Sequence, residues 1–244
     1  MSVEPPLWRT IHAALARDLA EGAFPPGTPL PAERLLAARF GCAIGTVRRA
    51  VDELVAARAL VRRQGKGTFV PDLGGDAAAP DRTHFYFFHI ARTDGLRETP
   101  RTELLDFRSP VPCPADYAPL LGIEPEVPMH RAQNLQYLQD RPVMLDEIWI
   151  PAALFPGLDE AGFAGREGTV YGLYQRRFGL SVVRTEERLR AERASPDIAA
   201  LLELPPEEPV LRILRIAHAI GDRPVELRLS WVDTRRHEYW NRLG

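Results

Sequence analysis

One short segment indicates how the first part of the chain folds: Leu30-Pro31-Ala32-Glu33-Arg34-Leu35-Leu36-Ala37-Ala38-Arg39-Phe40-Gly41. Proline suits the first turn of a helix and glycine suits the position just past its end, so we predict a helix from Pro31 to Phe40 that Gly41 terminates. Shortly afterwards a further helix is predicted by apolar residues at helical spacing, which are Val47, Val51, Leu54 and Val55. Two short helices joined by a tight turn form a helix-turn-helix.

The flanking residues extend this motif on both sides. An earlier helix is predicted by apolar residues that recur every four positions, namely Leu7, Ile11, Leu15 and Leu19. On the other side, two strand-like runs at 60–63 and 68–70 are separated by Gln64-Gly65-Lys66-Gly67. Glycine readily adopts the positive φ of a tight hairpin, so we predict a small β-wing with a cationic tip.

Length and composition limit the class of protein. The chain has 244 residues, enough for one large domain or two ordinary ones, and its 45% hydrophobic and 26% charged residues are typical of a folded soluble protein. The longest apolar run, 84–90, is far shorter than the roughly 18 residues that indicate a membrane span, and no secretory leader is apparent. We therefore expect a cytoplasmic protein without membrane contact.

Cysteine usage argues against disulfide or metal scaffolding. Cys42 and Cys113 are too few for a disulfide framework, and no Cys/His cluster has the spacing of a zinc site. We expect no metal, and we interpret Cys42 as a small core residue rather than a redox switch.

Charge is divided unevenly along the chain. Residues 1–71 hold ten Arg or Lys against six Asp or Glu, whereas residues 72–244 hold 21 basic and 27 acidic side chains. A basic head on an acidic body indicates that the head contacts a polyanion.

The rest of the chain is predicted to be an antiparallel α+β body. Residues 72–82 are rich in Gly, Pro, Asp and Ala and lack periodicity, as linkers do. Strands are expected at 84–91, 101–108, 129–138, 142–150, 184–194, 209–220 and 224–234, with helices near 114–121, 168–178 and 196–204. Two related hairpins are predicted to turn at Asp140-Arg141-Pro142-Val143 and Asp222-Arg223-Pro224-Val225. The two motifs are related because the proline of each is followed by a tryptophan at the same distance along the sequence.

These motifs together resemble a known family. Residues 30–41, Thr46-Val47-Arg48-Arg49-Ala50-Val51 and Gly65-Lys66-Gly67-Thr68-Phe69-Val70 resemble the winged-helix head of GntR-type transcription regulators in order and spacing. The body resembles the UTRA domain of the HutC subfamily through Pro142-Val143, Trp149-Ile150-Pro151, Phe155-Pro156, Thr169-Val170-Tyr171, Phe178-Gly179 and Pro224-Val225-Glu226.

The resemblance implies a three-part α+β chain. A winged helix-turn-helix domain would span 1–71, a linker 72–82, and a chorismate lyase-like UTRA domain, which binds effector and dimerises, 83–244. The implied function is a ligand-responsive transcriptional regulator, a repressor released by a small-molecule metabolite. We expect a homodimer on a palindromic double-stranded DNA operator, because one small head binds DNA weakly.

Basic and polar side chains of the head predict the DNA contacts. Side chains near the N-terminal end of a recognition helix reach base edges, and guanidinium groups bind phosphate or guanine through paired donors. The candidates on the third helix and the wing are Thr46, Arg48, Arg49, Gln64, Gly65 and Lys66, and the resemblance adds Arg34. The alternative is that these are solvated surface charges.

The start of the third helix departs from the family pattern. Cys42-Ala43-Ile44-Gly45 stands where relatives commonly have Val-Ser-Arg before the threonine, so a cap hydroxyl and a base-reading arginine are both absent. Gly45 would let a phosphate approach closely but supplies no side chain. We therefore predict a stronger reliance on Arg34, Arg48, Arg49 and the wing.

Alternation in the body predicts a polar sheet face. Along residues 224–232, Glu226, Arg228 and Ser230 share one face while Val225, Leu227, Leu229 and Trp231 share the other. Asp146 holds the parallel place in the first hairpin, so Asp146, Glu226 and Arg228 are expected to converge on a pocket. The alternative is that Glu226 and Arg228 form a surface ion pair.

The resemblance to UTRA domains implies a small-metabolite site here. It adds Thr169 at a helix start, where neighbouring amides could hold an anion. Many relatives have two arginines on the strand where we align Asn134 and Gln136, which argues against a phosphorylated sugar. A slip in register would bring in Arg131 instead.

The competing hypothesis is an enzyme, because the UTRA fold resembles chorismate lyase and some GntR-type heads are fused to aminotransferase-like bodies. A pyridoxal-phosphate Schiff base needs a lysine, and the only lysine, Lys66, lies in the wing. The sequence also lacks a Gly-x-Ser-x-Gly elbow, a phosphate loop and a Gly-x-Gly-x-x-Gly motif. We therefore expect neither catalysis nor a cofactor, although a lyase needs little apparatus.

Overall fold

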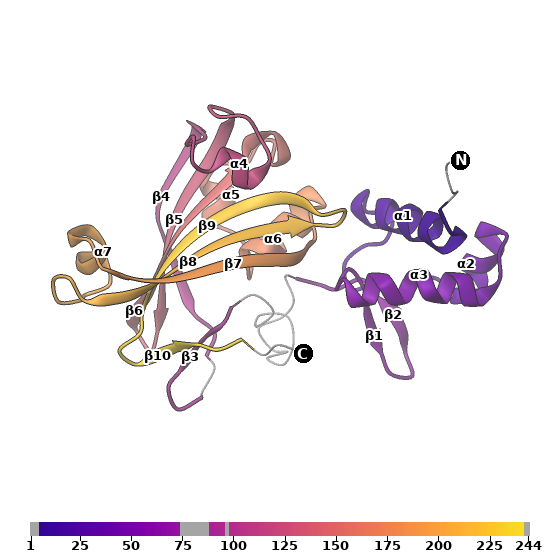
Figure 1. The fold of residues 1–244 in the computed structure, drawn as a ribbon, viewed down its shortest axis with the longest axis horizontal. Helices are drawn as coiled ribbons and strands as arrows, with labels where there is room; N and C mark the ends of the chain where they lie inside the picture. The colour runs from indigo at the N-terminus through magenta and orange to yellow at the C-terminus, as the bar shows by residue number, and fades with distance from the viewer. Residues whose placement is uncertain (1–4, 74–87, 96–97, 242–244) are drawn as a thin grey trace. The chain divides into compact units, whose positions relative to one another are not determined.

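The computed structural model describes residues 5–73, 88–95 and 98–241 (Figure 1). The chain divides into two compact units. The first comprises residues 1–76, 167–184 and 218–223, and the second comprises residues 77–166, 185–217 and 224–244. Most of the expected linker and the first half of the expected strand at 84–91 lie outside the described residues.

Three helices form the core of the first unit: α1 (Leu7–Ala20), α2 (Glu33–Phe40) and α3 (Ile44–Ala56). Their apolar stripes are buried against one another, and Cys42 packs against this core, as predicted. Helix α2 begins two residues later than predicted, because the Leu30 N–H donates to the Thr68 carbonyl and holds the preceding chain extended along the wing. Gly41 ends α2 in the left-handed conformation, with φ 60°.

The wing follows directly and has the predicted form. Strands β1 (Val61–Arg63) and β2 (Gly67–Phe69) pair antiparallel. Gly65 and Gly67 both have positive φ, at 70° and 114°, which a side chain would strain. The hairpin therefore depends on glycine at these two positions.

Helix α6 (Val170–Phe178) also belongs to the first unit, where it holds the chain just after the wing. The buried Gln175 amide accepts from the Leu73 N–H at 2.9 Å and donates to the Pro71 carbonyl at 2.9 Å. It also donates to the Ser181 hydroxyl at 2.9 Å. The Thr169 hydroxyl donates to the Leu73 carbonyl at 2.7 Å. We call these bonds the linker clamp.

The second unit is built on a six-stranded antiparallel sheet. Its strands, in spatial order, are β4 (Arg101–Pro112), β5 (Pro128–Leu138), β6 (Arg141–Pro151), β9 (Arg223–Asp233), β8 (Pro209–Ala219) and β7 (Val182–Arg193). Figure 1 shows them as one curved sheet. A separate two-stranded sheet joins β3 (Ile90–Arg92) to β10 (His237–Tyr239). The predicted α+β class is confirmed.

Short helices cover one face of the large sheet. Helix α4 (Ala118–Leu121) packs against Trp149, Leu227 and Leu229, and α7 (Pro196–Leu201) lies over Leu145 and Trp231. Strand β10, the one-turn helix η1 (Ala152–Leu154) and helix α5 (Glu160–Ala164) were not predicted from the sequence. The five residues of α5 are too few to show helical periodicity. The opposite face, away from α4 and α7, carries the polar side chains described below.

The two predicted hairpins pair through β6 and β9, so that they lie next to each other in the sheet. Each turns through two residues with positive φ, Gln139 and Asp140 in the first, Gly221 and Asp222 in the second. Such turns match the right-handed twist of the flanking strands. The pairing of these hairpins places Asp146 of β6 directly opposite Ser230 of β9.

Candidate functional site

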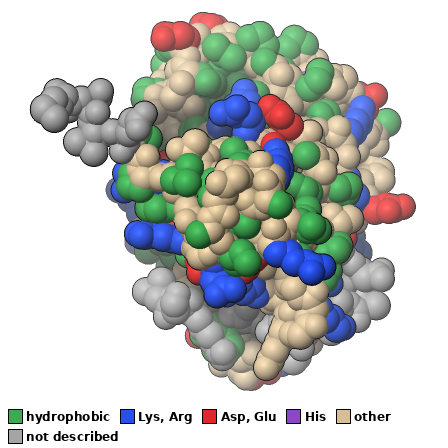
Figure 2. Space-filling view, turned by 90° about the vertical axis from the view of Figure 1, so that its right-hand side faces the viewer, with side chains coloured by type: hydrophobic (Ala, Val, Ile, Leu, Met, Phe, Trp, Pro, Cys, Tyr) green, Lys and Arg blue, Asp and Glu red, His purple; other side chains and the backbone are tan. Residues whose placement is uncertain are grey.

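The first candidate site is the cationic surface of the first unit. Arg34, Gln64, Gly65 and Lys66 are exposed, and neither the Arg34 nor the Lys66 side chain forms an ion pair with another described residue. Figure 2 shows Lys and Arg side chains in blue, with hydrophobic patches between them, over the face turned to the viewer. Exposed cations without carboxylate partners are available to bind phosphate.

Arg48 differs from Arg34 and Lys66, because its guanidinium is already bonded to a carboxylate. Its Nε donates to Glu33 Oε2 at 2.9 Å, and Glu33 Oε1 lies 3.7 Å from the Arg62 guanidinium. Arg62 also pairs with Asp52. Glu33 of α2 therefore links the recognition helix α3 to the wing strand β1, and it holds the Arg48 side chain in one place.

The other two residues predicted on α3 differ from Arg48. The Arg49 guanidinium lies 4.4 Å from the centre of the Trp8 ring, so it stacks on the α1 side of the domain. Thr46 is half-buried in the first turn of α3. Of the three, Arg49 is thus the one whose position is set by a contact with α1.

The second candidate site is the polar face of the large sheet. The pairing aligns Asn134 of β5 with Asp146 of β6, and Asp146 with Ser230 of β9, so the three side chains form a row across three strands. Gln136, two residues along β5, donates to Asp146 Oδ2, and Ser230 donates to Asp146 Oδ1 at 2.5 Å. Asp146 is fully buried.

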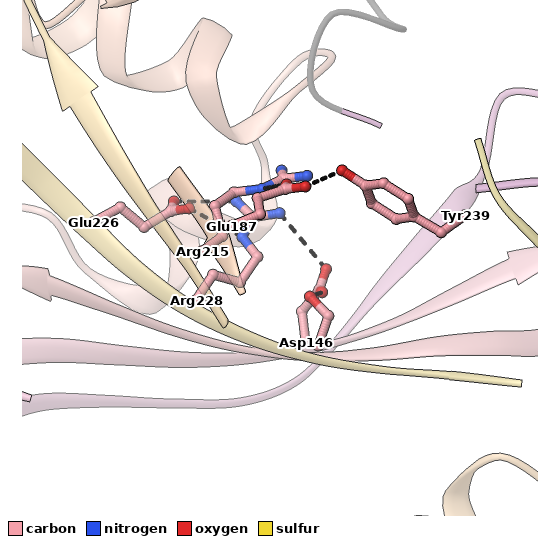
Figure 3. Close-up of polar contacts among 7 residues, drawn as sticks. Asp146, Glu187, Arg215, Glu226, Arg228 and Tyr239 are labelled. Carbon is pink, nitrogen blue, oxygen red and sulfur yellow. Dashed lines mark hydrogen bonds and ion pairs between the residues drawn. The ribbon is translucent and has the colours of Figure 1, made fainter. Parts of the chain in front are cut away.

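Arg228 joins the predicted acidic residues. Its Nε and Nη2 donate to the two oxygens of Glu226 at 3.0 Å each, and its Nη1 lies 3.6 Å from Asp146 Oδ2 (Figure 3). Glu226 is fully buried and Arg228 is 8% exposed. Arg228 thus contacts both Asp146 and Glu226, and the alternative of a surface ion pair is wrong because the pair is buried. The pocket on which the three side chains were expected to converge stays a prediction.

Three further residues extend this cluster, and the sequence analysis missed them. Arg215 of β8 donates to Glu187 of β7 at 2.5 Å, and the Tyr239 hydroxyl of β10 donates to the same carboxylate (Figure 3). Burial, followed by the hydrogen bond to Glu187, raises the pKa of Tyr239 well above its usual value of 10.0. Alternation along β7 and β8 could have shown which face Glu187 and Arg215 occupy, but it does not show which strands are neighbours.

Asn134 carries an unsatisfied acceptor. The residue is 1% exposed, and its Oδ1 has no hydrogen-bond partner among the described residues. A buried carbonyl oxygen without a donor costs about 1–3 kcal/mol. A bound molecule with an N–H or O–H group would relieve that cost.

The remaining predicted positions are resolved as follows. Asn134 and Gln136 lie on the face of Asp146, while Arg131 lies on the opposite face and pairs with Glu147 at 2.5 Å and Asp106 at 3.1 Å. Arg131 therefore does not reach the polar cluster. Thr169 belongs to the first unit, where it caps α6 by accepting from the Gly172 N–H at 2.9 Å and contributes to the linker clamp.

A three-helix head with a β-wing and exposed cations, joined to a sheet that buries a polar cluster, defines a ligand-responsive DNA-binding regulator of transcription. Residues 7–70 match the family described as bacterial regulatory proteins, gntR family, and residues 96–238 match the UTRA domain. The chain belongs to the GntR family, in the group whose members carry a UTRA domain.

Relatives agree with this assignment. The chain is 28% identical to a protein of Escherichia coli strain K12 named "Probable fructoselysine utilization operon transcriptional repressor", over 91% of this chain and 88% of that protein. It is 30% identical to the transcriptional regulator Rv0792c of Mycobacterium tuberculosis, over 88% and 77% respectively. A solved ligand-binding domain from Bordetella bronchiseptica, assigned to the GntR family, covers 66% of this chain and 99% of its own at 30% identity, with a TM-score of 0.62.

The relatives are transcriptional regulators, so the regulatory reading is favoured over the enzymatic one. Within the described stretches, no helix is long and apolar enough to cross a membrane.

Proposed function

We propose that this regulator is a repressor that leaves its operator when a small-molecule metabolite binds. The observation that carries the DNA-binding half is the winged helix whose Arg34 and Lys66 side chains are exposed on elements that can reach a duplex. Arg48, Arg49, Thr46, Gln64 and Gly65 complete the proposed DNA contacts. The proposed linker at residues 72–82 joins the DNA-binding head, 1–71, to the effector domain, 83–244, whose helix α6 groups with the head in one compact unit.

Salt dependence tests the DNA contact. Fluorescence anisotropy with duplexes from upstream regions of the source genome should show binding that weakens steeply as salt rises, because each phosphate contact releases counterions. Retention of no duplex, with or without candidate metabolites, would refute the DNA-binding function.

The polar cluster of the second unit is the proposed effector site. Its carboxylates are Asp146, Glu187 and Glu226, and its guanidinium groups are Arg215 and Arg228, so the cluster carries one net negative charge. A phosphate dianion is repelled by such a site, whereas hydroxyl and ammonium groups are attracted. The unsatisfied Asn134 Oδ1 would likewise accept a hydrogen bond from a hydroxyl or ammonium group.

We therefore propose an effector rich in O–H and N–H donors, without a phosphate. The name of the Escherichia coli relative refers to fructoselysine, an amine-linked sugar of this chemical class. Fructoselysine and glucose 6-phosphate form a suitable pair of probes for thermal-shift measurements, because a ligand at 100 times its Kd stabilises the fold by about 2.7 kcal/mol. Stronger stabilisation by the phosphate ester would refute the proposed class.

A variant pair locates the site. Asn134→Leu should abolish the ligand-induced shift, because it removes the acceptor on the cluster face. Gln133→Leu, one residue away on the opposite face of β5, is the matched control and should retain the shift. An equal response in both variants would move the effector elsewhere.

The proposed assembly is a homodimer on a palindromic operator, acting in the cytoplasm. Two heads related by a two-fold axis can occupy two half-sites, which one head cannot. Sedimentation of the protein with its operator should give two chains per duplex, and one chain per duplex at saturation would refute the dimer.

We propose that the chain has no catalytic activity. Incubation of the full chain with chorismate and with its effector should yield no product, and turnover at a useful rate would favour the lyase-like alternative.

A further inference from the structure

Ile44 is an aliphatic side chain exposed where the recognition helix begins. It is the first residue of α3 and is 46% exposed. Among the described residues, the exposed large hydrophobic side chains are Leu7, Leu35, Ile44 and Leu189. A single exposed aliphatic residue is ordinary on a protein surface, so its significance depends on its surroundings.

The first turn of α3 offers few exposed side chains that can read bases, because Thr46 is half-buried. Gly45 has no side chain, and a Cβ placed there meets nothing within 4 Å. Arg48 is bonded to Glu33 at 2.9 Å, and Arg49 stacks on Trp8 at 4.4 Å. In the first turn of α3, Ile44 is therefore the large hydrophobic side chain that is exposed.

The chemistry of the major groove then specifies the partner. Base edges in that groove present hydrogen-bond donors and acceptors, and the one apolar group among them is the 5-methyl of thymine. A helix-turn-helix places the N-terminal residues of its second helix against these edges. The exposed cations Arg34 of α2 and Lys66 of the wing belong to the same domain and match the phosphates that flank the groove.

We propose that Ile44 selects thymine at a fixed operator position by packing against its 5-methyl group. This inference rests on the DNA-binding function and adds a base preference to it. It also explains how the head can read sequence at a place where it has neither a cap hydroxyl nor an arginine.

Removal of single methyl groups from the operator tests the proposal. An operator is first selected from random duplexes, and each thymine is then replaced in turn by deoxyuridine, which lacks only the methyl. The wild-type chain should lose about fourfold in affinity at the contacted thymine, as expected for about 0.8 kcal/mol per buried methyl-sized group at 1.36 kcal/mol per tenfold. Other thymines should have little effect.

Two variants assign the effect to Ile44. Ile44→Ala should bind the thymine and deoxyuridine duplexes equally well. Leu189→Ala is the matched control, because Leu189 is also 46% exposed but lies on β7, and it should keep the fourfold discrimination. Thermal melting of both variants should remain close to that of the wild type, because both side chains are exposed.

The outcomes separate the inference from the function. If the wild-type chain binds no duplex, the DNA-binding function and the inference both fail. If it binds an operator but every deoxyuridine substitution leaves its affinity unchanged, only the inference fails. If Ile44→Ala keeps the fourfold discrimination, the methyl is read by another residue and the assignment to Ile44 is overturned.

Discussion

Replacing Gln175 with leucine should loosen the chain just after the wing. The Gln175 amide is 4% exposed and makes three hydrogen bonds, to the Leu73 N–H and to the Pro71 and Ser181 oxygens. Leucine fills a similar volume but makes none of them. The Leu73 N–H, on a residue only 8% exposed, then loses its acceptor, which costs about 1–3 kcal/mol.

The size of the expected effect depends on the Leu73 N–H. Pro71 and Ser181 are half-buried, so their oxygens can turn to water, and most of the cost falls on Leu73. We expect the free energy of local opening to fall by about 2 kcal/mol, which corresponds to roughly 30-fold faster exchange of the Leu73 amide.

Hydrogen–deuterium exchange read by mass spectrometry on peptides that contain residue 73 measures this change. Ser181→Ala is the control, because it removes one bond of the clamp and leaves both bonds to the linker in place. If Gln175→Leu and the wild type exchange at the same rate at residue 73, the clamp does not hold this segment and the reasoning is wrong.

Three further predictions concern the head, the buried cluster and pH. Lys66→Ala should make the slope of log K against log salt less steep by about 0.9 for each Lys66 that contacts a phosphate, hence by about 1.8 for the proposed dimer. Lys66→Arg should preserve the slope, and anisotropy titrations at several salt concentrations that show no change for Lys66→Ala would contradict the contact. Arg228→Leu removes the bidentate partner of the buried Glu226 and should lower the free energy of unfolding by about 3 kcal/mol, so an unchanged urea midpoint would contradict it. Burial lowers the pKa of His130 below its usual 6.5, so the unfolded chain binds the extra proton first and stability should decline as the pH falls below about 6.5. The decline should be smaller in His130→Gln, and an equal slope would remove His130 as its cause.

The head could be predicted from the sequence because its signals are local. Helical periodicity and the terminating Gly41 fixed the positions of the three helices within a few residues, and the glycines at 65 and 67 marked the wing. The start of α2 was misplaced because it depends on a contact between Leu30 and the wing strand, 38 residues further on. Local patterns do not report such a contact.

The buried polar cluster could be predicted only in part, for the same physical reason. Alternation along β9 and the repeated hairpin placed Asp146, Glu226 and Arg228 on one face, because both signals are contained within single hairpins. Glu187 and Tyr239 are 52 residues apart, and their contact depends on the order of strands in space. The alternation within one strand shows which of its side chains share a face, but it does not show which strand lies beside it in the sheet.

Glu33 has a consequence for how the head distinguishes its operator from other DNA. Its carboxylate accepts from the Nε of Arg48 and lies within 4 Å of Arg62, so its negative charge offsets part of the attraction of either cation for a phosphate. Any random duplex offers phosphates, and this offset weakens the attraction to all of them alike. An internal acid of this kind lowers the background affinity of the head for bulk chromosome, so that the contacts to the correct bases decide where the protein stays.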